Sequence, residues 1–556
     1  MPRTDHKDHG WDEGVDRGIP QRVTLEAVLR MTRVIRSTFV KGPLAALLGA
    51  LTVLALPPFS LLPFLVLGLG GLFLLLCRAG PAAAVLTGWS FGMGYFIAGI
   101  HWIGESFFVD AERFGWMAAP AVGGLSAFLA LFIAIPAWIF ARLRWGGVAD
   151  ATVFALLWTA SEWLRGHVLT GFPWNLVAYA WVDHPAPRQI AAVFGSYGLS
   201  LLTVFAAVLM PLSLLATSRR DRHSARMAAL LALLILAAGA LRLPPDSGED
   251  GIARAEDLSG PLVRIVQGNI PQVKKWLPEQ RAATVERYLD LSSRPGRYDL
   301  LLWPETAYPG FLDEAGEMLA RIAARLPPGA HLLAGTPRRS YEPTGRAIWN
   351  AVITVNDGGG IEGVYDKHHL VPFGEYVPLR GVLPLNQFTA GFGDFSAGPG
   401  PRTLQVGAQT VGVAICYEAI FPGELVDRTR RPDWIFNPTN DAWFGTSIGP
   451  DQHLASARMR AVEEGLPMVR AANTGISAVI DGYGTISAKL PLNETGIVDA
   501  RLPPPLSPTP YARWGDLLLV PLALAVVLSS VLVGGWKGRL RARPPARQPS
   551  HGSGAA

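Results

Sequence analysis

Long apolar stretches fill the first half of the chain and return near its end. They run over 43–57, 59–77, 81–100, 115–141, 148–165, 190–217, 226–243 and 515–536. A helix needs roughly 17–25 mainly apolar residues to cross the hydrocarbon core of a bilayer. The pattern therefore predicts a membrane domain over 43–245 with seven transmembrane helices, and an eighth, last transmembrane helix over 515–536.

The segment 257–502 has a different pattern. Short apolar runs of strand length lie at 262–266, 300–303, 331–334, 351–355, 411–415 and 434–436. Amphipathic stretches lie between them, at 278–292, 313–326 and 452–464. Strands that alternate with helices are typical of an α/β domain. We therefore expect one folded domain of that class between the seventh and eighth spans.

Arginines gather in the loops between alternate spans. The clusters comprise Arg78; Arg142 and Arg144; Arg219, Arg220, Arg222 and Arg226; and, after the last span, Lys537, Arg539, Arg541, Arg543 and Arg547. Short loops rich in lysine and arginine stay in the cytoplasm. This predicts cytoplasmic tails at 1–42 and 537–556, the second of them disordered. It places 257–502 in the periplasm, if the membrane is a bacterial inner membrane.

The composition is that of a membrane protein, and it argues against a nucleic-acid partner and against a disulfide-bonded fold. Half of the 556 residues are hydrophobic, 17% are charged and the mean hydropathy is +0.26, which is more apolar than is usual for a soluble chain. The net charge of +5 is spread over short clusters, and without a continuous basic face it argues against a nucleic-acid partner. The two cysteines, Cys77 and Cys416, provide no disulfide framework.

Three residues form a candidate catalytic set, because each ends or follows a predicted strand. Glu305 lies in LLLWPET, Lys367 in VYDKHHLVPFGEYVP and Cys416 in VGVAICYEAIFP. A carboxylate base, a fixed ammonium and a thiol nucleophile suffice for acyl transfer through a thioester. Taken singly, each has a plainer interpretation. Glu305 would be an acid at a helix start, Lys367 a solvated charge at a sheet edge, and Cys416 a buried thiol.

With these three motifs the chain resembles the nitrilase (carbon–nitrogen hydrolase) superfamily, and with its membrane spans it is similar to the bacterial apolipoprotein N-acyltransferase family. The resemblance implies a four-layer α-β-β-α sandwich for 257–502. It also implies three roles: Glu305 is the general base, Lys367 stabilises the oxyanion of the tetrahedral intermediate, and Cys416 carries the acyl group.

The resemblance implies a second set of residues around these three. Glu375, in FGEYVP, would hold Lys367 and orient the attacking nucleophile. The supporting positions are Trp276, Asn350, Glu375, Tyr417 and Glu418. A plainer interpretation of the two glutamates makes each the buried partner of an arginine.

Aromatic residues near the candidate nucleophile indicate a lipid substrate. Phe373, Phe388 and Phe392 lie in a loop between 370 and 395, and Trp443 and Phe444 lie in a later loop. Apolar loops beside a bilayer suit a lipid chain better than a small polar amide. We therefore interpret these five residues as parts of lipid-entry loops.

We expect a two-step acyltransferase. A membrane phospholipid gives an acyl chain to Cys416, and the α-amine of the S-diacylglyceryl-cysteine of an apolipoprotein then takes it, which by resemblance is the last step of lipoprotein maturation. The alternatives are a membrane-tethered amidase or nitrilase acting on a small C–N substrate, and a non-catalytic lipid transporter. We expect a monomer with no cofactor and no metal, since the adjacent His368 and His369 lack the usual spacing of metal ligands.

Overall fold

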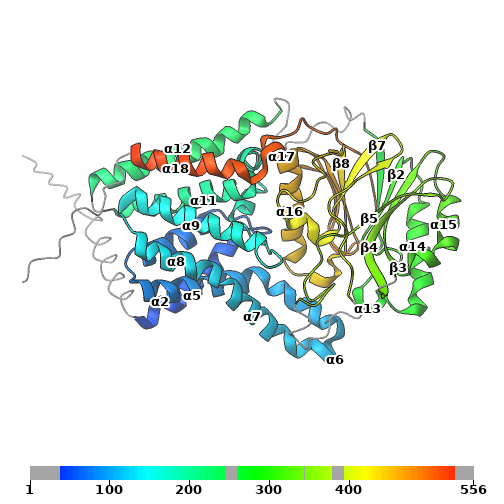
Figure 1. Cartoon of the computed structure of the whole chain (residues 1–556), viewed down its shortest axis with the longest axis horizontal. Helices are drawn as coiled ribbons and strands as arrows, with labels where there is room; N and C mark the ends of the chain where they lie inside the picture. Colours follow the sequence, from blue (N-terminus) through cyan, green and yellow to red (C-terminus); the bar gives the residue numbers. More distant parts are fainter. Residues whose placement is uncertain (1–37, 217, 245–259, 343–344, 379–393, 533–556) are drawn as a thin grey trace, which may run out of the picture.

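The computed structural model describes residues 38–216, 218–244, 260–342, 345–378 and 394–532. Figure 1 shows two halves side by side, a bundle of helices and a layered sandwich of strands and helices. Most of the predicted tail 1–42 and all of 537–556 lie outside the described residues, and α2 begins at Thr38, inside the first of them. The domain limits given above stay predictions.

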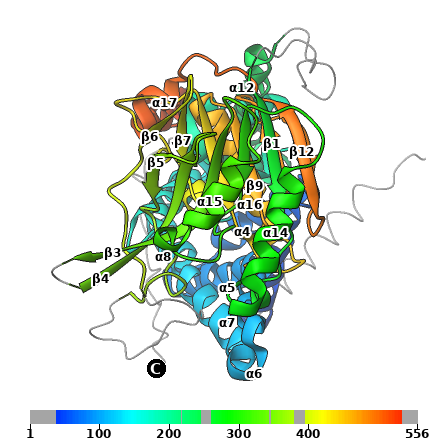
Figure 2. The same cartoon turned by 90° about the vertical axis from the view of Figure 1, so that its right-hand side faces the viewer.

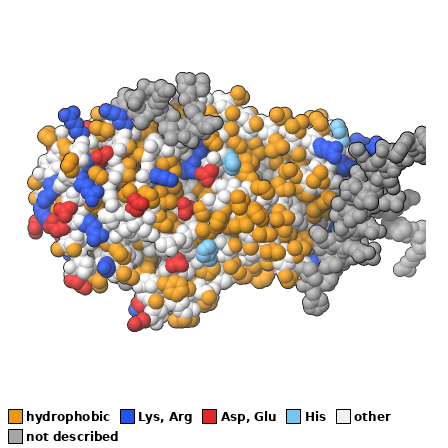
Figure 3. All heavy atoms as spheres, turned by 180° about the vertical axis from the view of Figure 1, so that it is seen from behind, with side chains coloured by type: hydrophobic (Ala, Val, Ile, Leu, Met, Phe, Trp, Pro, Cys, Tyr) orange, Lys and Arg blue, Asp and Glu red, His pale blue; other side chains and the backbone are white. Residues whose placement is uncertain are grey.

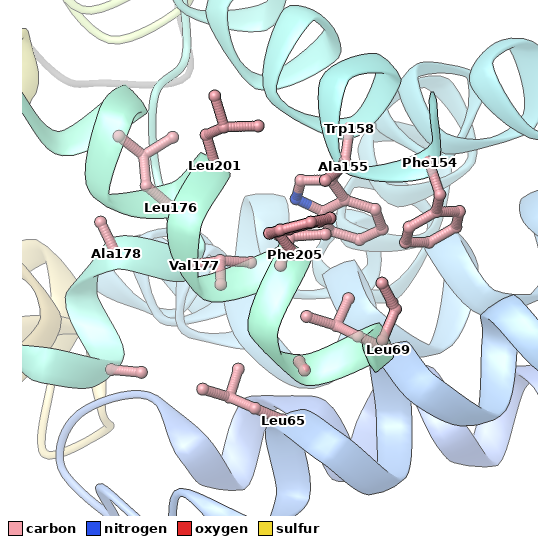
Figure 4. Close-up of a cluster of buried hydrophobic side chains, with 14 of the residues drawn as sticks. Leu65, Leu69, Phe154, Ala155, Trp158, Leu176, Val177, Ala178, Leu201 and Phe205 are labelled. Carbon is pink, nitrogen blue, oxygen red and sulfur yellow. The ribbon is translucent and has the colours of Figure 1, made fainter. Parts of the chain in front are cut away.

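The helical half is built from apolar helices. Its main elements are α2 (Thr38–Thr52), α3 (Pro63–Leu65), η2 (Val66–Gly70), α4 (Gly71–Leu76), α5 (Pro81–Ile100), η3 (His101–Asp110), α6 (Ala111–Phe114), α7 (Ala118–Leu129), α8 (Leu131–Leu143), α9 (Gly147–His167), α11 (Ala191–Leu215), α12 (Arg219–Ala238), α17 (Pro510–Trp514) and α18 (Leu519–Leu532). A helix satisfies its own main-chain polar groups, which a bilayer requires. Side chains from η2, α9 and α11, among them Leu69, Trp158 and Phe205, meet inside the bundle (Figure 4).

Four helical segments of the described chain are long and apolar enough to cross a membrane. They are Pro81–Leu143, Ala191–Leu215, Arg219–Arg242 and Pro510–Leu532. Pro81–Leu143 folds back on itself, because α5 packs against α7 and α8. The first two predicted spans correspond to shorter apolar helices, Lys41–Ala55 and Pro63–Leu76.

Length and composition therefore do not confirm all eight predicted spans. The fifth predicted span coincides with α9, which carries the buried side chains of Asp150, Glu162 and Arg165 and is correspondingly less apolar. The surface still divides into two kinds. Figure 3 shows hydrophobic side chains crowded over the helical half, and most of the visible acidic side chains over the sandwich.

The sandwich contains two six-stranded sheets in the described residues, with the orders β12-β1-β2-β3-β4-β5 and β11-β10-β9-β8-β7-β6. The strands are β1 (Leu262–Gln267), β2 (Leu300–Trp303), β3 (His331–Glu342), β4 (Gly345–Val355), β5 (Ile361–Asp366), β6 (Thr403–Val406), β7 (Gln409–Val413), β8 (Trp434–Thr439), β9 (Met468–Ala472), β10 (Ser477–Ile480), β11 (Ile486–Leu490) and β12 (Gly496–Arg501). β1, β2 and β3 run parallel, as do β7, β8 and β9.

Helices cover the outer faces of both sheets. α14 (Arg281–Ser292) and α15 (Gly316–Ala323) lie across the first sheet, as Figure 2 shows, and α16 (Gly449–Glu464) lies against the second. Apolar residues of the two inner faces, such as Leu302 and Phe436, share one core between the sheets. The layers therefore follow the α-β-β-α order that the resemblance implied.

The sequence predicted much of this sandwich. The six apolar runs are confirmed as β1, β2, β3, β4, β7 and β8, and the three amphipathic stretches as η8 (Pro278–Gln280) with α14, as α15 and as α16. β6 and β9 to β12 were not predicted. β11 alternates between exposed and half-buried positions, and β12 carries Asp499 and Arg501 in its second half, so neither is a continuous apolar run.

The two halves meet through α16. This helix packs against α11, and Met459 and Val462 of α16 belong to the same buried core as Leu199 and Val204 of α11. Ile420 and Phe421, just after the candidate nucleophile, also belong to that core. The strand ends that carry the candidate chemistry are therefore held close to the helical half.

Candidate active site

The three predicted catalytic residues come together where strands of the two sheets end. Glu305 follows β2, Lys367 follows β5 and Cys416 follows β7. Lys367 Nζ lies 3.7 Å from Glu305 Oε1, and all three side chains are buried. Both charged groups act on the Cys416 thiol. One buried site thus contains a thiol, a carboxylate and an ammonium from three separate parts of the chain.

The turn that carries Cys416 has an unusual backbone. The φ angle of Cys416 is +49°, in the left-handed region that residues other than glycine rarely adopt. Ile415 before it is extended, and the short helix η10 (Cys416–Ile420) begins at the cysteine. Strained turns of this kind recur where a nucleophile must be held in a fixed position between a strand and a helix.

Two acids and an amide fix the lysine. The Nζ of Lys367 lies 2.9 Å from Glu375 Oε2 and donates to Glu375 Oε1 at 3.0 Å. Asn350 Nδ2 donates to Glu305 Oε1 at 2.6 Å and to Glu375 Oε1 at 2.9 Å. Asn350 therefore bridges the two carboxylates, and Lys367 is held between them. The neighbouring Asp366 does not compete, because its carboxylate accepts two hydrogen bonds from Arg338.

Burial and charge set the protonation of the site. Burial raises the pKa of the Cys416 thiol well above its usual range, Glu305 raises it further and Lys367 acts in the opposite direction. The resting residue is therefore a thiol that needs a base. Burial alone would lower the pKa of Lys367, but the Glu375 and Glu305 carboxylates outweigh it and raise the pKa. Lys367 is therefore an ammonium at neutral pH.

A cavity of about 980 Å³ connects this polar site to the helical half. Glu305, Lys367 and Cys416 line one end. Apolar side chains of α7 and α8, including Leu125 and Phe132, line another part. The cavity is therefore polar where the chemistry lies and apolar where it enters the helical bundle.

Comparisons with known proteins match both halves. Residues 48–209 match the apolipoprotein N-acyltransferase N-terminal domain, and residues 262–508 match the carbon-nitrogen hydrolase family. The apolipoprotein N-acyltransferase of Rhodopseudomonas palustris is 41% identical over 532 residues, which cover 91% of this chain and 96% of the relative. That of Bradyrhizobium diazoefficiens is 42% identical over 511 residues, which cover 87% and 93%. The chain belongs to the apolipoprotein N-acyltransferase family.

Solved structures of the carbon–nitrogen hydrolase superfamily are similar to part of this family member. The protein XC1258 from Xanthomonas campestris is 20% identical and covers 44% of this chain and 91% of its own, with a TM-score of 0.32. An amidase from Nesterenkonia sp. is 20% identical and covers 46% of this chain and 92% of its own, also with a TM-score of 0.32.

Glu418 holds the site of this family member together without touching the catalytic atoms. Its carboxylate accepts from the main-chain N–H groups of Ile415 at 2.6 Å and His368 at 2.8 Å, and from the Tyr365 hydroxyl at 3.0 Å. It thus ties the end of β7 to the end of β5. The interpretation of Glu418 as the partner of an arginine is wrong, because its partners are main-chain N–H groups, Tyr365 and His368. Glu375 pairs with Lys367 and Asn350.

Most of the predicted lipid-entry and supporting residues lie at the cavity, and two of them fall outside the described residues. Phe373, Trp443, Phe444, Trp276 and Tyr417 line the cavity. The Tyr417 hydroxyl also donates to the Gly171 carbonyl of the helical half at 3.1 Å. Phe388 and Phe392 lie outside the described residues.

A second buried lysine, Lys275, lies at the site and was not among the predicted site residues. Its Nζ donates to the main-chain oxygen of Glu305 at 3.0 Å. Burial lowers its pKa from 10.5 to about 8, although the Glu305 and Cys416 charges act to raise it. The available signal was its position directly before Trp276. A lysine next to a tryptophan is ordinary in a surface loop, so the sequence alone gave no reason to place this one inside.

Two groups of described residues bring three possible metal ligands within 4.8 Å of one another: His368, His369 and Glu424, and Cys416, Asp441 and His453. In the first group, His368 Nδ1 contacts Glu418 and Tyr365, and His369 contacts Glu424 and the Thr170 carbonyl. In the second group, both nitrogens of His453 face oxygen atoms of the protein. We interpret both groups as hydrogen-bonded clusters.

Proposed function

We propose that this family member moves a fatty acyl chain from a membrane phospholipid, through a thioester on Cys416, to the α-amine of the S-diacylglyceryl-cysteine of apolipoproteins. The proposal rests on one observation: a single cavity joins the Glu305, Lys367 and Cys416 side chains to apolar side chains of the helical half. The relatives carry the name apolipoprotein N-acyltransferase, and the transferred chain is chemically suited to such a cavity.

The first step transfers the acyl chain to the enzyme. Glu305 takes the proton of the Cys416 thiol, and Sγ attacks the ester carbonyl of the phospholipid. The Lys367 ammonium lies beside both groups and stabilises the negative charge that forms on the carbonyl oxygen. The C–O bond then breaks, Glu305 returns the proton to the departing alkoxide, and a lysophospholipid leaves.

The second step regenerates the thiol. The α-amine of the acceptor attacks the thioester carbonyl, so a C–N bond forms and the C–S bond breaks. Glu305 takes a proton from the attacking amine and returns it to Cys416 Sγ. Glu375 and Asn350 keep Lys367 and Glu305 in place throughout, through bonds of 2.6 to 3.0 Å.

The size and lining of the cavity favour a lipid over the substrate of a small-molecule amidase. Ligand pockets commonly measure roughly 300–1,000 Å³, and this cavity of about 980 Å³ lies at the upper end. Much of its lining is aromatic: the rings of Trp102 and Phe444 are 4.4 Å apart and those of Trp102 and Trp174 4.5 Å apart. A small polar amide would leave most of this apolar wall without contact.

We also propose eight transmembrane helices, a periplasmic sandwich, two cytoplasmic termini and a monomer. The placement of the basic loops supports this topology. Arg144 donates to the carbonyl of Cys77, next to Arg78. Gly147, three residues after Arg144, lies beside Asp221 in the first turn of α12. In Figure 1, α12 begins at the end of the bundle that is remote from the sandwich. Basic loops thus gather opposite the catalytic half, as the positive-inside rule requires.

The mass of the intact protein tests the reaction in two stages. After incubation with phospholipid vesicles alone, we expect one acyl chain on Cys416. Addition of a diacylglyceryl lipopeptide should remove this adduct and produce the N-acylated lipopeptide. The matched control is the same lipopeptide with an acetylated α-amine, which should leave the adduct in place. Ammonia release from small amides with no adduct from phospholipid would instead support the amidase alternative.

Reporter fusions test the topology. A reporter that works only outside the cytoplasm should be active when fused after Pro261 and inactive when fused after Arg226 or at the C-terminus. The opposite result would place Cys416 in the cytoplasm and refute the proposed acceptor, because the site would then face away from exported lipoproteins.

A further inference from the structure

A buried histidine binds the main chain of the nucleophile. His453 lies on α16, is fully buried, and has Nε2 3.0 Å from the carbonyl oxygen of Cys416. A carbonyl oxygen only accepts hydrogen bonds, so Nε2 is the donor. The other ring nitrogen, Nδ1, lies 2.8 Å from Asp441 Oδ1 and 3.1 Å from Arg470 Nη2.

This histidine is one member of a series of hydrogen bonds that joins two main-chain carbonyls near the nucleophile. Arg470 Nη2 donates to Asp441 Oδ2 at 2.6 Å, and its Nη1 donates to Asn437 Oδ1 at 2.6 Å. Asn437 Nδ2 then donates to the carbonyl of Ala414 at 2.6 Å. The series therefore starts at the carbonyl two residues before the nucleophile and ends at the carbonyl of the nucleophile itself.

The ends of this series lie on both sides of the left-handed turn at Cys416. Such a backbone conformation costs about 1–3 kcal/mol and persists only where the surroundings fix it. All the side chains of the network, namely Asn437, Asp441, His453 and Arg470, are fully buried, so water does not compete for their bonds. The network is thus placed to hold the turn in its strained conformation.

The bond from His453 also fixes a second group. The carbonyl of Cys416 and the N–H of Tyr417 belong to one planar trans peptide and point in opposite directions. When His453 holds the carbonyl, it also sets the direction of the Tyr417 N–H. A hydrogen bond to the carbonyl polarises the peptide group and makes its N–H a stronger donor.

We propose that His453 is a positioning residue that aims the Tyr417 main-chain N–H at the acyl carbonyl oxygen, on the opposite side from the Lys367 ammonium. Two donors then stabilise the oxyanion in both half-reactions, one from a side chain and one from the main chain. This inference rests on the proposed thioester chemistry of Cys416. It assigns to Asp441 and Arg470 the task of holding the His453 ring.

The alternative role for His453 is that of a general base for Cys416. Cys416, His453 and Asp441 are the residue types of a nucleophile, base and acid triad, and their ligand atoms lie within 4.8 Å of one another. In the structure, however, Nε2 is directed at the carbonyl oxygen of Cys416. Glu305 remains the base in our account, and His453 transfers no proton.

Substitution of His453 by glutamine separates the two roles. A glutamine amide N–H reaches the place of His453 Nε2 and can donate to the Cys416 carbonyl, but it cannot take a proton. We expect acylation of Cys416 by a small, water-soluble activated ester to fall by about 10²-fold in His453→Leu, the effect of losing one oxyanion donor. The rate in His453→Gln should stay within about tenfold of the parent rate, with an unchanged pH profile and KM.

Ser456→Ala, on the same helix, is the matched control, since its hydroxyl donates to the Gln452 carbonyl within α16 and bonds Tyr179 of the helical half, not the main chain of Cys416. The soluble ester reports on Cys416 whether or not phospholipid is the natural donor, so failure of this inference differs from failure of the proposed function. A His453→Gln protein that unfolds at the parent temperature but reacts as slowly as His453→Leu, or with a changed pH profile, would overturn the positioning role. A His453→Leu protein with the parent rate would also overturn it. If His453→Leu does not fold, the comparison of His453→Gln with the parent decides alone.

Discussion

The two ends of the cavity are built on different principles. At the sandwich end, Glu305, Lys367 and Cys416 are buried, and contacts of 2.6 to 3.7 Å with polar partners fix the two charged groups. At the helical end, Leu125 and Phe132 line the same cavity without hydrogen-bonding groups in their side chains. The sandwich end therefore offers charges and directed hydrogen bonds to a substrate, and the helical end offers apolar contact.

This difference indicates a division of tasks. Hydrogen bonds and charges act over short distances and demand fixed geometry, which two sheets and their strand ends provide. Apolar contacts are non-directional, so packed helices suffice to bind a flexible acyl chain. We expect changes at the sandwich end to impair the reaction with every donor, and changes at the helical end to impair only reactions with lipids.

The largest effect is expected at the nucleophile. Cys416→Ala should abolish both adduct formation and acyl transfer, because no other described thiol lies in the cavity. Cys77→Ala is the control, since Cys77 lies at the end of α4 and should leave the rate unchanged. The mass of the intact protein after incubation with phospholipid measures both. An acyl adduct that survives in Cys416→Ala would refute the assignment of the nucleophile.

The next largest effect is expected at the lysine. Lys367→Met should lower the acylation rate by about 10²-fold or more, with any donor. Lys367→Arg should not restore the rate, because a planar guanidinium does not fit the place of a compact ammonium between Glu305 and Glu375. Initial rates with phospholipid and with a soluble ester test this. A near-normal rate in Lys367→Arg would show that any positive charge suffices.

Lys275 should affect stability and rate in opposite directions. Its pKa falls from 10.5 to about 8 in the folded protein, so below pH 8 the folded state carries the full cost of a buried ammonium. As the pH rises from 8 to 10.5 the unfolded state binds more protons than the folded state, and this cost disappears. Lys275→Met should therefore raise the free energy of unfolding by about 1–3 kcal/mol at pH 7.

The gain in stability from Lys275→Met should shrink as the pH approaches 10. The rate should fall by about tenfold, since the bond to the Glu305 main chain is lost. Thermal unfolding followed across this pH range, together with initial rates, provides the measurement. Lower stability at pH 7 would contradict the account of a strained, buried ammonium.

A smaller pair of effects concerns the thiol. The Glu305 carboxylate raises the pKa of Cys416 and the Lys367 ammonium lowers it. Alkylation of Cys416 by a soluble reagent, followed against pH, should therefore show a lower apparent pKa in Glu305→Gln and a higher one in Lys367→Met. Shifts in the same direction would mean that the two charges do not act on the thiol separately.

The sequence predicted the candidate catalytic set and, by resemblance, the nearest supports Asn350, Glu375 and Glu418, but not the network behind Cys416. Glu305, Lys367 and Cys416 stand in local motifs at strand ends, so each was visible from its own neighbours. The network of Asn437, Asp441, His453 and Arg470 depends on pairing between distant segments. Asn437 of β8 and Arg470 of β9 are direct partners in the parallel register, and β9 was not predicted at all. A sequence without known strand pairing cannot show such contacts.

In the helical half, the sequence predicted where the helices lie but not how they are interrupted or which charges they bury. Apolar length predicted helices correctly in almost every place, yet it did not separate spans from broken or charged helices. The chain from Pro63 to Leu76 passes through a π-helix, Val66–Gly70, and α9 buries Glu162 and Arg165. Arg165 donates to the carbonyls of Phe172 and Trp174, so a charge that lowers hydropathy here shapes a loop of the cavity wall. The mean hydropathy of a segment does not reveal the role of such a single charged residue.

The division between the two ends of the cavity can be tested in one experiment with two donors. Leu125→Trp narrows the helical end and keeps it apolar, and Leu131→Trp on α8, outside the cavity lining among the described residues, controls for the added bulk. Acylation of Cys416 from phospholipid and from a small, water-soluble ester is compared by intact mass in both variants. We predict that Leu125→Trp slows acylation from phospholipid by about tenfold or more and leaves the reaction with the soluble ester unchanged, and that Leu131→Trp changes neither. Equal loss with both donors in Leu125→Trp would contradict the account.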